Sequence, residues 1–319
     1  MPTTERARQA ARSLPRSFSI SRRGWHVVAP TWIGVLGSAA GALIASGIGL
    51  WWYASRIEPY WVQWRSVTLP IVGLPAAFDG YRIVQLSDLH FGKGKRFGAA
   101  QLAGIARRVN RLRPDCIALT GDFVSHFDPV SEAGIQQIAR LRAADGLFCV
   151  PGNHDYWNGE GVIERAVTQA GGQWLINRAH VIRRADAVLT LAGVDDCWEG
   201  RPDLAASLRD VAADACVILL AHEPNFADIT QTDPRVVVQL SGHSHGGQVR
   251  VPGFGPVMLP DQAWRYPMGL YSVQRDAGQR SLWVYTNRGL GMAEMGYRLF
   301  CRPEVTLFTL RTAPSISGG

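Results

Sequence analysis

Five short apolar segments of this chain each run into aspartate, histidine or asparagine. They are residues 81–87 before Asp88 and His90, 116–120 before Asp122, 147–150 before Asn153, His154 and Asp155, 216–221 before His222, and 236–240 before His243 and His245. Short apolar runs are typical of buried strands, and open α/β sheets bind ligands beyond the carboxyl ends of their strands. The pattern predicts an α/β fold in which five loops build one polar site.

The segments between and after these runs complete the prediction. Leu102, Ile105 and Val109 fall on one face of a helix that ends at Pro114, and Ile135 and Ile138 mark a second helix. Further strands are expected at 188–192, 282–286 and 305–310. The chain should therefore begin as α/β and finish richer in β-structure.

The polar residues at the strand ends form a set with a definite chemistry. The set is Asp88, His90, Asp122, Asn153, His222, His243 and His245. Oxygen and imidazole donors without thiolate suit Mn, Fe or Zn ions. Seven ligands exceed what one such ion takes from protein, so we expect two divalent ions that share a carboxylate. Two ions lower the pKa of a water from about 16 towards 7 and so supply hydroxide for attack on phosphorus.

Each motif alone is weakly informative, but all five in order resemble the calcineurin-like metallophosphoesterases over roughly residues 78–312. The strings LSGHSHGGQVRVPGFG and RGLG…RPEV are similar to membrane-associated bacterial phosphodiesterases of the YaeI/YkuE type. The resemblance implies a four-layer αββα sandwich with a dinuclear metal centre.

The resemblance also implies residue roles. One metal would be held by Asp88, His90 and His245, the other by Asn153, His222 and His243, with Asp122 bridging them. His154 would contact the phosphate and protonate the leaving oxygen, and Asp155 would orient His154.

One motif departs from the protein phosphatases of this superfamily, which carry G-D-x-x-D-R-G. Here Ser125 and His126 stand in place of the second Asp and the Arg. The departure weakens the case for a phosphoprotein substrate. His126 either contacts phosphate in their place or is a solvent-facing loop histidine.

An uncharged segment precedes this domain. Residues 32–53 carry no charge over 22 positions, with Trp32 at one end and Trp51, Trp52 and Tyr53 at the other. A helix of this length spans about 33 Å, enough to cross a bilayer, and aromatic residues are enriched at both membrane interfaces. The expected organisation is an arginine-rich tail at 1–30, a transmembrane helix or signal anchor at 31–53, a juxtamembrane linker at 54–77, the catalytic domain at 78–312 and a flexible tail at 313–319. A buried core helix is the alternative for 31–53.

Charge predicts the orientation of the chain. Residues 1–30 hold six arginines and one acid, so they carry +5 of the net +7 and leave the body nearly neutral at +2. The positive-inside rule places this tail in the cytoplasm and the catalytic domain on the periplasmic or extracytoplasmic side of the inner membrane. Arg22 and Arg23 also resemble a twin-arginine export signal, so a cleaved signal remains the alternative. Gly37 and Gly41 are compatible with a monomer or a weak helix-mediated dimer.

The cysteine pattern and the charge distribution argue against a disulfide-stabilised protein and against a nucleic-acid-binding protein. The five cysteines form no C-x-x-C pair, and Cys116, Cys149 and Cys216 lie in apolar runs, so buried, unpaired thiols are expected. No basic stripe with interleaved aromatic residues is present, so we expect no nucleic-acid partner.

The leading functional hypothesis is a membrane-tethered dinuclear-metal phosphoesterase. Metal-activated hydroxide would hydrolyse a phosphodiester or a lipid-linked phosphate, with the bilayer as a partner through the N-terminal helix. One alternative is a UDP-2,3-diacylglucosamine pyrophosphatase, which requires the domain on the cytoplasmic side. Another, from a different class, is a non-catalytic protein that uses the metal cluster for binding.

Overall fold

The computed structural model describes residues 31–92, 97–158, 161–275 and 280–314, with side chains from residue 41 onward. The predicted arginine-rich tail at 1–30 and residues 315–319 lie outside this range. The chain divides into two compact units, Met1–Ile48 and Gly49–Gly319.

Helix α1, Thr31–Arg56, covers the segment predicted to span a membrane. Leu43, Ile44 and Ile48 on this helix are exposed. In the part of the chain that the structure describes, no helix meets the length and hydropathy required of a bilayer-spanning segment. The predicted transmembrane helix at 31–53 therefore finds no support in the described residues.

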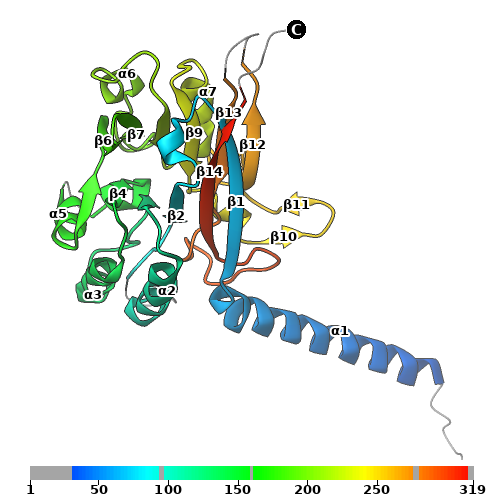
Figure 1. Ribbon diagram of the computed structural model, residues 1–319. Helices are drawn as coiled ribbons and strands as arrows, with labels where there is room; N and C mark the ends of the chain where they lie inside the picture. The colour runs from blue at the N-terminus through cyan, green and yellow to red at the C-terminus, as the bar shows by residue number, and fades with distance from the viewer. Residues whose placement is uncertain (1–30, 93–96, 159–160, 276–279, 315–319) are drawn as a thin grey trace, which may run out of the picture. The chain divides into compact units, whose positions relative to one another are not determined.

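Two six-stranded mixed sheets make up the second unit (Figure 1). The first has the order β1-β14-β2-β3-β4-β5, and the second has the order β12-β13-β9-β8-β7-β6. The strands of the first sheet are β1 Gln63–Val72, β14 Glu304–Ala313, β2 Arg82–Leu86, β3 Cys116–Thr120, β4 Gly146–Val150 and β5 Gly172–Trp174. Those of the second are β12 Gly269–Val273, β13 Leu282–Thr286, β9 Val236–Ser241, β8 Val217–Leu220, β7 Ala187–Gly193 and β6 Arg178–Arg184.

The centre of each sheet is parallel. Strands β2 to β5 run parallel to one another, as do β7, β8, β9 and β13, whereas β6 and β12 are antiparallel edges of the second sheet. All eight strands predicted from the sequence are present, as β2, β3, β4, β7, β8, β9, β13 and β14. A small hairpin, β10 Arg250–Val251 and β11 Gly255–Pro256, stands apart from both sheets.

The core lies between the two sheets. Phe148 and Phe308 of the first sheet are buried in one cluster with Ile218 and Leu240 of the second. Helices α2 Ala99–Leu112, α3 Pro129–Ile135 and α5 Val162–Gln169 cover the outer face of the first sheet through a second cluster. A third cluster joins the second sheet to the short helices α6 Leu204–Ser207, η4 Pro224–Phe226 and α7 Ala227–Thr230. The layers follow the predicted αββα order, with a last layer of single turns.

The sheet begins before the predicted domain boundary at residue 78. Strand β1 lies inside the segment predicted as a linker, yet it pairs in parallel with β14 from Gln63↔Glu304 to Val72↔Ala313. Its only fully buried side chains are Leu69 and Ile71. The first half of β1 is largely polar and its later apolar residues are interrupted by Pro70, which an edge strand tolerates, so the strand lacks the short apolar run that marks a central strand. The segment from Ala54 onward is therefore part of the folded domain.

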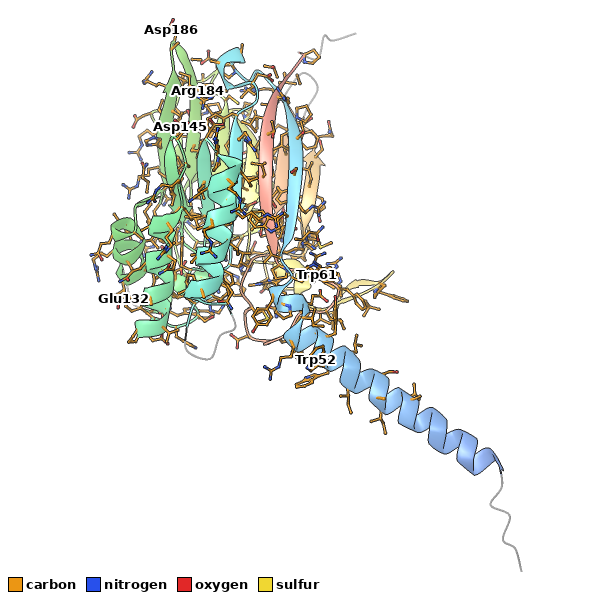
Figure 2. All side chains as sticks on the ribbon, turned by 60° about the horizontal axis from the view of Figure 1, so that its bottom comes forward. Trp52, Trp61, Glu132, Asp145, Arg184 and Asp186 are labelled. Carbon is orange, nitrogen blue, oxygen red and sulfur yellow. The ribbon has the colours of Figure 1, made fainter. Side chains whose placement is uncertain are left out.

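Charged side chains join the two sheets at the end remote from the predicted site. Arg184, at the end of β6, pairs with Asp115 and lies 3.7 Å from Asp145, two acids that precede β3 and β4 (Figure 2). Asp145 also accepts a hydrogen bond from Tyr81. Such partly exposed pairs contribute little stability.

The cysteine prediction is confirmed. All five thiols are free, and Cys116, Cys149, Cys216 and Cys301 are buried. Burial raises the pKa of each of these thiols, which makes them inert small apolar groups.

Candidate metal centre

The residues predicted as ligands meet at one edge of the sandwich. They follow β2, β3 and β4 of the first sheet and β8 and β9 of the second, and Asn153 opens the short helix α4 Asn153–Tyr156. Because these strands are parallel, their carboxyl ends deliver all five loops to one edge. The sequence prediction that five loops build one polar site is confirmed.

The backbone at this edge is strained. Five ligand residues adopt positive φ, between 47° and 64°: Asp88, His90, Asp122, His243 and His245. Such conformations are costly for non-glycine residues and cluster at functional sites. Two neighbouring glycines are required by close approach, because a Cβ on Gly242 would lie 2.4 Å from Asp88 Oδ2 and one on Gly152 would lie 2.3 Å from Asp122 Oδ1. The loops are therefore shaped to bring carboxylates against backbone.

The first ligand cluster consists of Asp88, His90, Asp122 and His245, whose ligand atoms all lie within 4.8 Å of one another. His90 Nε2 is 3.0 Å from His245 Nε2 and 3.3 Å from Asp122 Oδ2. His245 Nε2 is 3.3 Å from Asp88 Oδ1. All four side chains are buried. The cluster matches the first predicted metal site together with its bridging carboxylate.

The second ligand cluster contains His222 and His243, with ring centroids 5.0 Å apart. His222 Nε2 lies 3.3 Å from Asp122 Oδ2, the same oxygen that faces His90. Asp122 thus stands between the two clusters, as a bridging ligand must. Glu223 joins this cluster with ligand atoms within 4.8 Å of both histidines.

Cations fit this donor set. Among the described residues, Asp88 Oδ2 and Asn153 Oδ1 are buried without a hydrogen-bond partner. Buried carboxylate and amide oxygens are costly unless they are satisfied. Divalent ions bound at these two oxygens would satisfy both.

Hydrogen bonds to the remaining ring nitrogens orient the imidazoles. His222 Nδ1 lies 2.7 Å from the carbonyl oxygen of Thr120, and His243 Nε2 lies 2.8 Å from that of Asp261. A carbonyl accepts only from N–H, so these bonds leave the lone pair on His222 Nε2 and His243 Nδ1. The tautomers are those that metal ligation needs.

The charges of the cluster depend on its burial. Burial opposes charge on Asp122, yet His222 and His90 hold the pKa of Asp122 well below its usual range. Burial also opposes a charged His222, but Asp122 raises the pKa of His222 well above its usual value. Burial, aided by His90, keeps the pKa of His245 well below normal, while burial raises the pKa of Asp88 to about 7. Without cations the cluster therefore holds protons that metal binding would displace.

His154 lies over this centre. Its backbone N–H donates to Asp122 Oδ1 at 3.0 Å, and its ring centroid is 4.7 Å from that of His90 and 4.1 Å from that of Trp157. A pocket of about 260 Å³ opens above it. The pocket lining combines Asp122, Asn153, His154, His243 and His245 with Trp157, Trp198, Met258, Leu259, Pro260 and Met295. The position suits the predicted contact with a substrate phosphate, which stays a prediction.

Asp155 has a different environment from the one expected. Its carboxylate accepts hydrogen bonds from the backbone N–H groups of Gly152, Asp122, Phe123 and Val124. Burial raises the pKa of Asp155 to about 8, and these donors act in the opposite direction. Both oxygens are engaged with backbone, so Asp155 clamps the loop of Asp122 to the loop of Asn153. These contacts do not support the prediction that Asp155 orients the ring of His154.

Ser125 and His126, the two residues that depart from the G-D-x-x-D-R-G motif, lie in different environments. Ser125 is buried, and its Oγ lies 3.0 Å from His90 Nδ1, so it orients a ligand imidazole. His126 is exposed, in agreement with the interpretation as a solvent-facing loop histidine.

Sequence reasoning missed two further features of the site. Arg298 is completely buried, donates to backbone carbonyls of the 288–291 loop and lies 3.4 Å from His245 Nδ1. Asp196 accepts hydrogen bonds from the backbone N–H groups of Trp198 and Glu199, and burial together with Glu223 raises the pKa of Asp196 to about 9. Nothing in the sequence marks Arg298 or Asp196, whereas Glu223 directly follows a predicted ligand.

The comparisons with known proteins agree with this geometry. Residues 81–247, more than half of the chain, match the profile of the calcineurin-like phosphoesterases. The chain belongs to this family. Its two clusters around Asp122 are accordingly the dimetal site of a calcineurin-like phosphoesterase, and the protein is a metal-dependent phosphoesterase.

Three relatives of this calcineurin-like phosphoesterase are informative. YkuE of Bacillus subtilis, named an uncharacterized metallophosphoesterase, is 34% identical over 86% of this chain and 93% of its own. The phosphodiesterase YaeI of Escherichia coli is 32% identical over 86% of this chain and 96% of its own. A transmembrane protein with a metallophosphoesterase domain from Danio rerio is 30% identical over 78% of this chain and 57% of its own. Among solved structures, a dimetal phosphatase from Danio rerio has a TM-score of 0.41 at 12% identity, over 66% of this chain and 88% of that one.

Proposed function

We propose that this protein is a membrane-tethered phosphodiesterase that acts on a phosphodiester or lipid-linked phosphate outside the cytoplasm. The observation that carries the reaction class is Asp122, whose Oδ2 lies 3.3 Å from both His90 Nε2 and His222 Nε2 beneath an open pocket. Two divalent ions bound there would polarise a phosphoryl oxygen and lower the pKa of a water towards neutrality.

The chain's own residues supply the remaining steps. The His154 ring lines the pocket beside the ligand His90, where it can hold a phosphoryl oxygen and give a proton to the leaving oxygen. The backbone bond from His154 to Asp122 fixes the distance between this acid and the metal ligands. The hydrogen bonds to Asp155 hold the loop of Asp122 and the loop of Asn153 in fixed positions relative to each other.

The pocket wall supports an apolar group on the substrate. Met258, Leu259, Pro260 and Met295 form one side of it, and Trp157 and Trp198 stand near the histidines. Apolar side chains with a few convergent polar groups are typical of small-molecule binding sites, and here the apolar part of the wall is free to contact an apolar group. The exposed Leu43, Ile44 and Ile48 of α1, and a relative that is named a transmembrane protein, support the tether.

The test of the reaction uses the full chain with Mn²⁺. Wild type should hydrolyse bis(p-nitrophenyl) phosphate, and His154→Ala should lose about 10²- to 10⁴-fold in kcat, as expected for a general acid, with metal content unchanged. His126→Ala, an exposed histidine, is the matched control. Undiminished turnover in His154→Ala would remove this residue from the mechanism. Metal binding without any turnover by wild type would favour the non-catalytic binding protein.

The apolar wall also suits an acylated nucleotide sugar, UDP-2,3-diacylglucosamine, and this alternative requires the catalytic domain on the cytoplasmic side. The side of the membrane on which the catalytic domain lies distinguishes the two candidate substrates. Reporters active only outside or only inside the cytoplasm, fused after Gly319, should show the domain outside. An inside result would overturn the proposed orientation and place the pyrophosphatase first.

A further inference from the structure

Three segments far apart in the sequence form one continuous surface beside the metal pocket. They are residues 51–61 at the end of α1, residues 249–259 around the β10–β11 hairpin, and residues 297–302; we call them together the docking face. Arg298 N–H donates to the carbonyl of Ala54 at 2.9 Å, and Phe300 N–H donates to the buried Glu58 carboxylate at 2.9 Å. Arg250 N–H donates to the carbonyl of Leu299 at 2.9 Å. The three segments are therefore fixed to one another within a single compact unit.

The docking face exposes large apolar side chains. Phe254, at the tip of the hairpin that projects from the domain in Figure 1, is 91% exposed, and Val257 and Met258 are 66% and 60% exposed. Trp52 and Trp61 are more than half exposed where α1 meets the first sheet (Figure 2). The remaining exposed members are Trp51, Ile57, Tyr60, Val251, Tyr297 and Phe300. Contiguous apolar exposure on this scale marks a contact surface.

The charges on the docking face identify the occupant. Glu58 is the only acid in the three segments, and it is fully buried. Arg56, Arg250 and Arg302 supply positive charge, and the Arg302 guanidinium lies 3.9 Å from the centre of the Trp61 ring. Aromatic and arginine side chains over an apolar surface match the interface of a bilayer with anionic headgroups.

A second copy of the chain fits this surface poorly. In a symmetric dimer the same patch lies on both subunits, so arginines would face arginines with no exposed carboxylate from these segments between them. A bilayer with anionic lipid offers phosphates to all three arginines and hydrocarbon to Phe254.

The docking face leads into the metal pocket. Met258 belongs to both, because it is 60% exposed and also lines the pocket with Leu259 and Pro260. Three residues further on, the carbonyl of Asp261 holds the imidazole of His243. An acyl chain lying along the hairpin would therefore end beside the two ligand clusters.

We propose that the docking face lies on the surface of an anionic bilayer, so that the metal pocket receives the phosphoester headgroup of a lipid directly from it. The part of this proposal in which the pocket takes up a lipid substrate rests on the proposed phosphodiesterase function. The part in which the hairpin contacts the membrane does not.

The membrane contact is tested on the full chain in vesicles of phosphatidylcholine and phosphatidylglycerol. An environment-sensitive fluorophore is attached to Phe254→Cys in a Cys197→Ser background, since the other four thiols are buried. Ile229→Cys, on α7 and 52% exposed, is the matched control. Nitroxide-labelled lipids should quench the probe at 254 and not the probe at 229. The proposal would be overturned by equal quenching at both sites or by quenching at neither. It would also be overturned, in favour of self-association, if the probe at 254 became shielded in detergent as the protein concentration rose.

The substrate part is tested by Phe254→Asp, with Ile229→Asp as its control. Hydrolysis of vesicle lipid should fall about tenfold in Phe254→Asp, because a charge replaces an apolar contact with the bilayer, while bis(p-nitrophenyl) phosphate hydrolysis stays within about twofold. An equal loss on both substrates would overturn the docking role. Wild type that cleaves the soluble diester but no vesicle lipid would overturn lipid delivery alone. Wild type that cleaves neither would overturn the proposed function, and the quenching experiment would still decide the membrane contact.

Discussion

The metal centre and the docking face depart from the ordinary pattern of burial in opposite directions. At the metal centre, carboxylates and imidazoles such as Asp88, His90 and His222 are completely buried. At the docking face, Phe254 is 91% exposed, and Trp51, Trp52 and Trp61 are each more than half exposed. Buried polar groups and exposed apolar groups are both unfavourable without a partner. Each region therefore indicates something that the chain alone does not supply: cations in one, and apolar material in the other.

The two regions also differ in how they are held. The metal ligands sit at the ends of central strands, on backbone with positive φ, and are fixed by hydrogen bonds to carbonyls and to Ser125. The hairpin is held at its base by the β10–β11 pairing and by the Arg250 N–H bond to Leu299, and its tip at Phe254 is 91% exposed. Catalysis needs positions fixed to fractions of an ångström, whereas a membrane contact needs only area and charge.

The largest expected effect lies at the shared carboxylate. Asp122→Asn removes the negative charge that both clusters use, so kcat/KM for a soluble diester should fall about 10³-fold, or about 4 kcal/mol of transition-state stabilisation. Metal analysis should find fewer than two ions bound per chain. Asp186→Asn, in the exposed turn between β6 and β7 (Figure 2), should change neither quantity. Full activity in Asp122→Asn would contradict a bridging role.

Removal of metal should be the next largest effect. Buried carboxylates lose their counter-charge, so chelation should lower the melting temperature by about 5–10 °C, the value expected when free metal exceeds its Kd about 100-fold. Calorimetry with and without chelator measures this, and added Mn²⁺ should restore the loss. The double variant Asp88→Ala, His222→Ala should melt at the same temperature with and without chelator. A chelator effect of equal size in that variant would place the stabilising ion elsewhere.

A smaller loss is expected at Ser125. Ser125→Ala removes the hydroxyl that orients His90, and such partners of ligand histidines are worth about 10- to 100-fold in metal affinity or activity. Metal titration followed by activity should show the loss at low Mn²⁺ and recovery at high Mn²⁺. Ser66→Ala, an exposed serine on β1, serves as the control. A loss that excess metal leaves unchanged would argue against orientation of a ligand.

The smallest effect sharpens the contrast between the regions. Phe254→Ser should change the free energy of unfolding by no more than about 0.5 kcal/mol, because this side chain has almost no contacts to lose. Phe78→Ala, at a residue with 0% exposure between the sheets, should cost about 3–5 kcal/mol. Denaturant unfolding of both variants checks the pair. A large cost at Phe254 would mean that the hairpin packs against this domain.

Several elements could be predicted because their signal is local. Strands β2, β3 and β9 are short apolar runs, and the residues after them include every ligand of the first cluster. Strand β1 was not predicted, because an edge strand buries only some of its residues and so lacks a continuous apolar run. Strand β6 is also an edge strand, and it carries arginines at its start and end. The roles of Asp155 and Ser125 depend on backbone groups and rings that lie 30 or more residues away in the sequence, or in another loop.

The sequence by itself determined the chemistry of this protein. Asp, His and Asn after buried strands predict a metal site wherever parallel strands end together, because strand direction alone brings them to one edge. Only the tertiary structure decided that Asp155 clamps the loop of Asp122, that Arg298 lies 3.4 Å from His245 and that the 249–259 hairpin and the end of α1 both bond to the 297–302 segment. These relations join segments that are distant in the chain. They arise from how the two sheets pack, and no local pattern of residues encodes that packing.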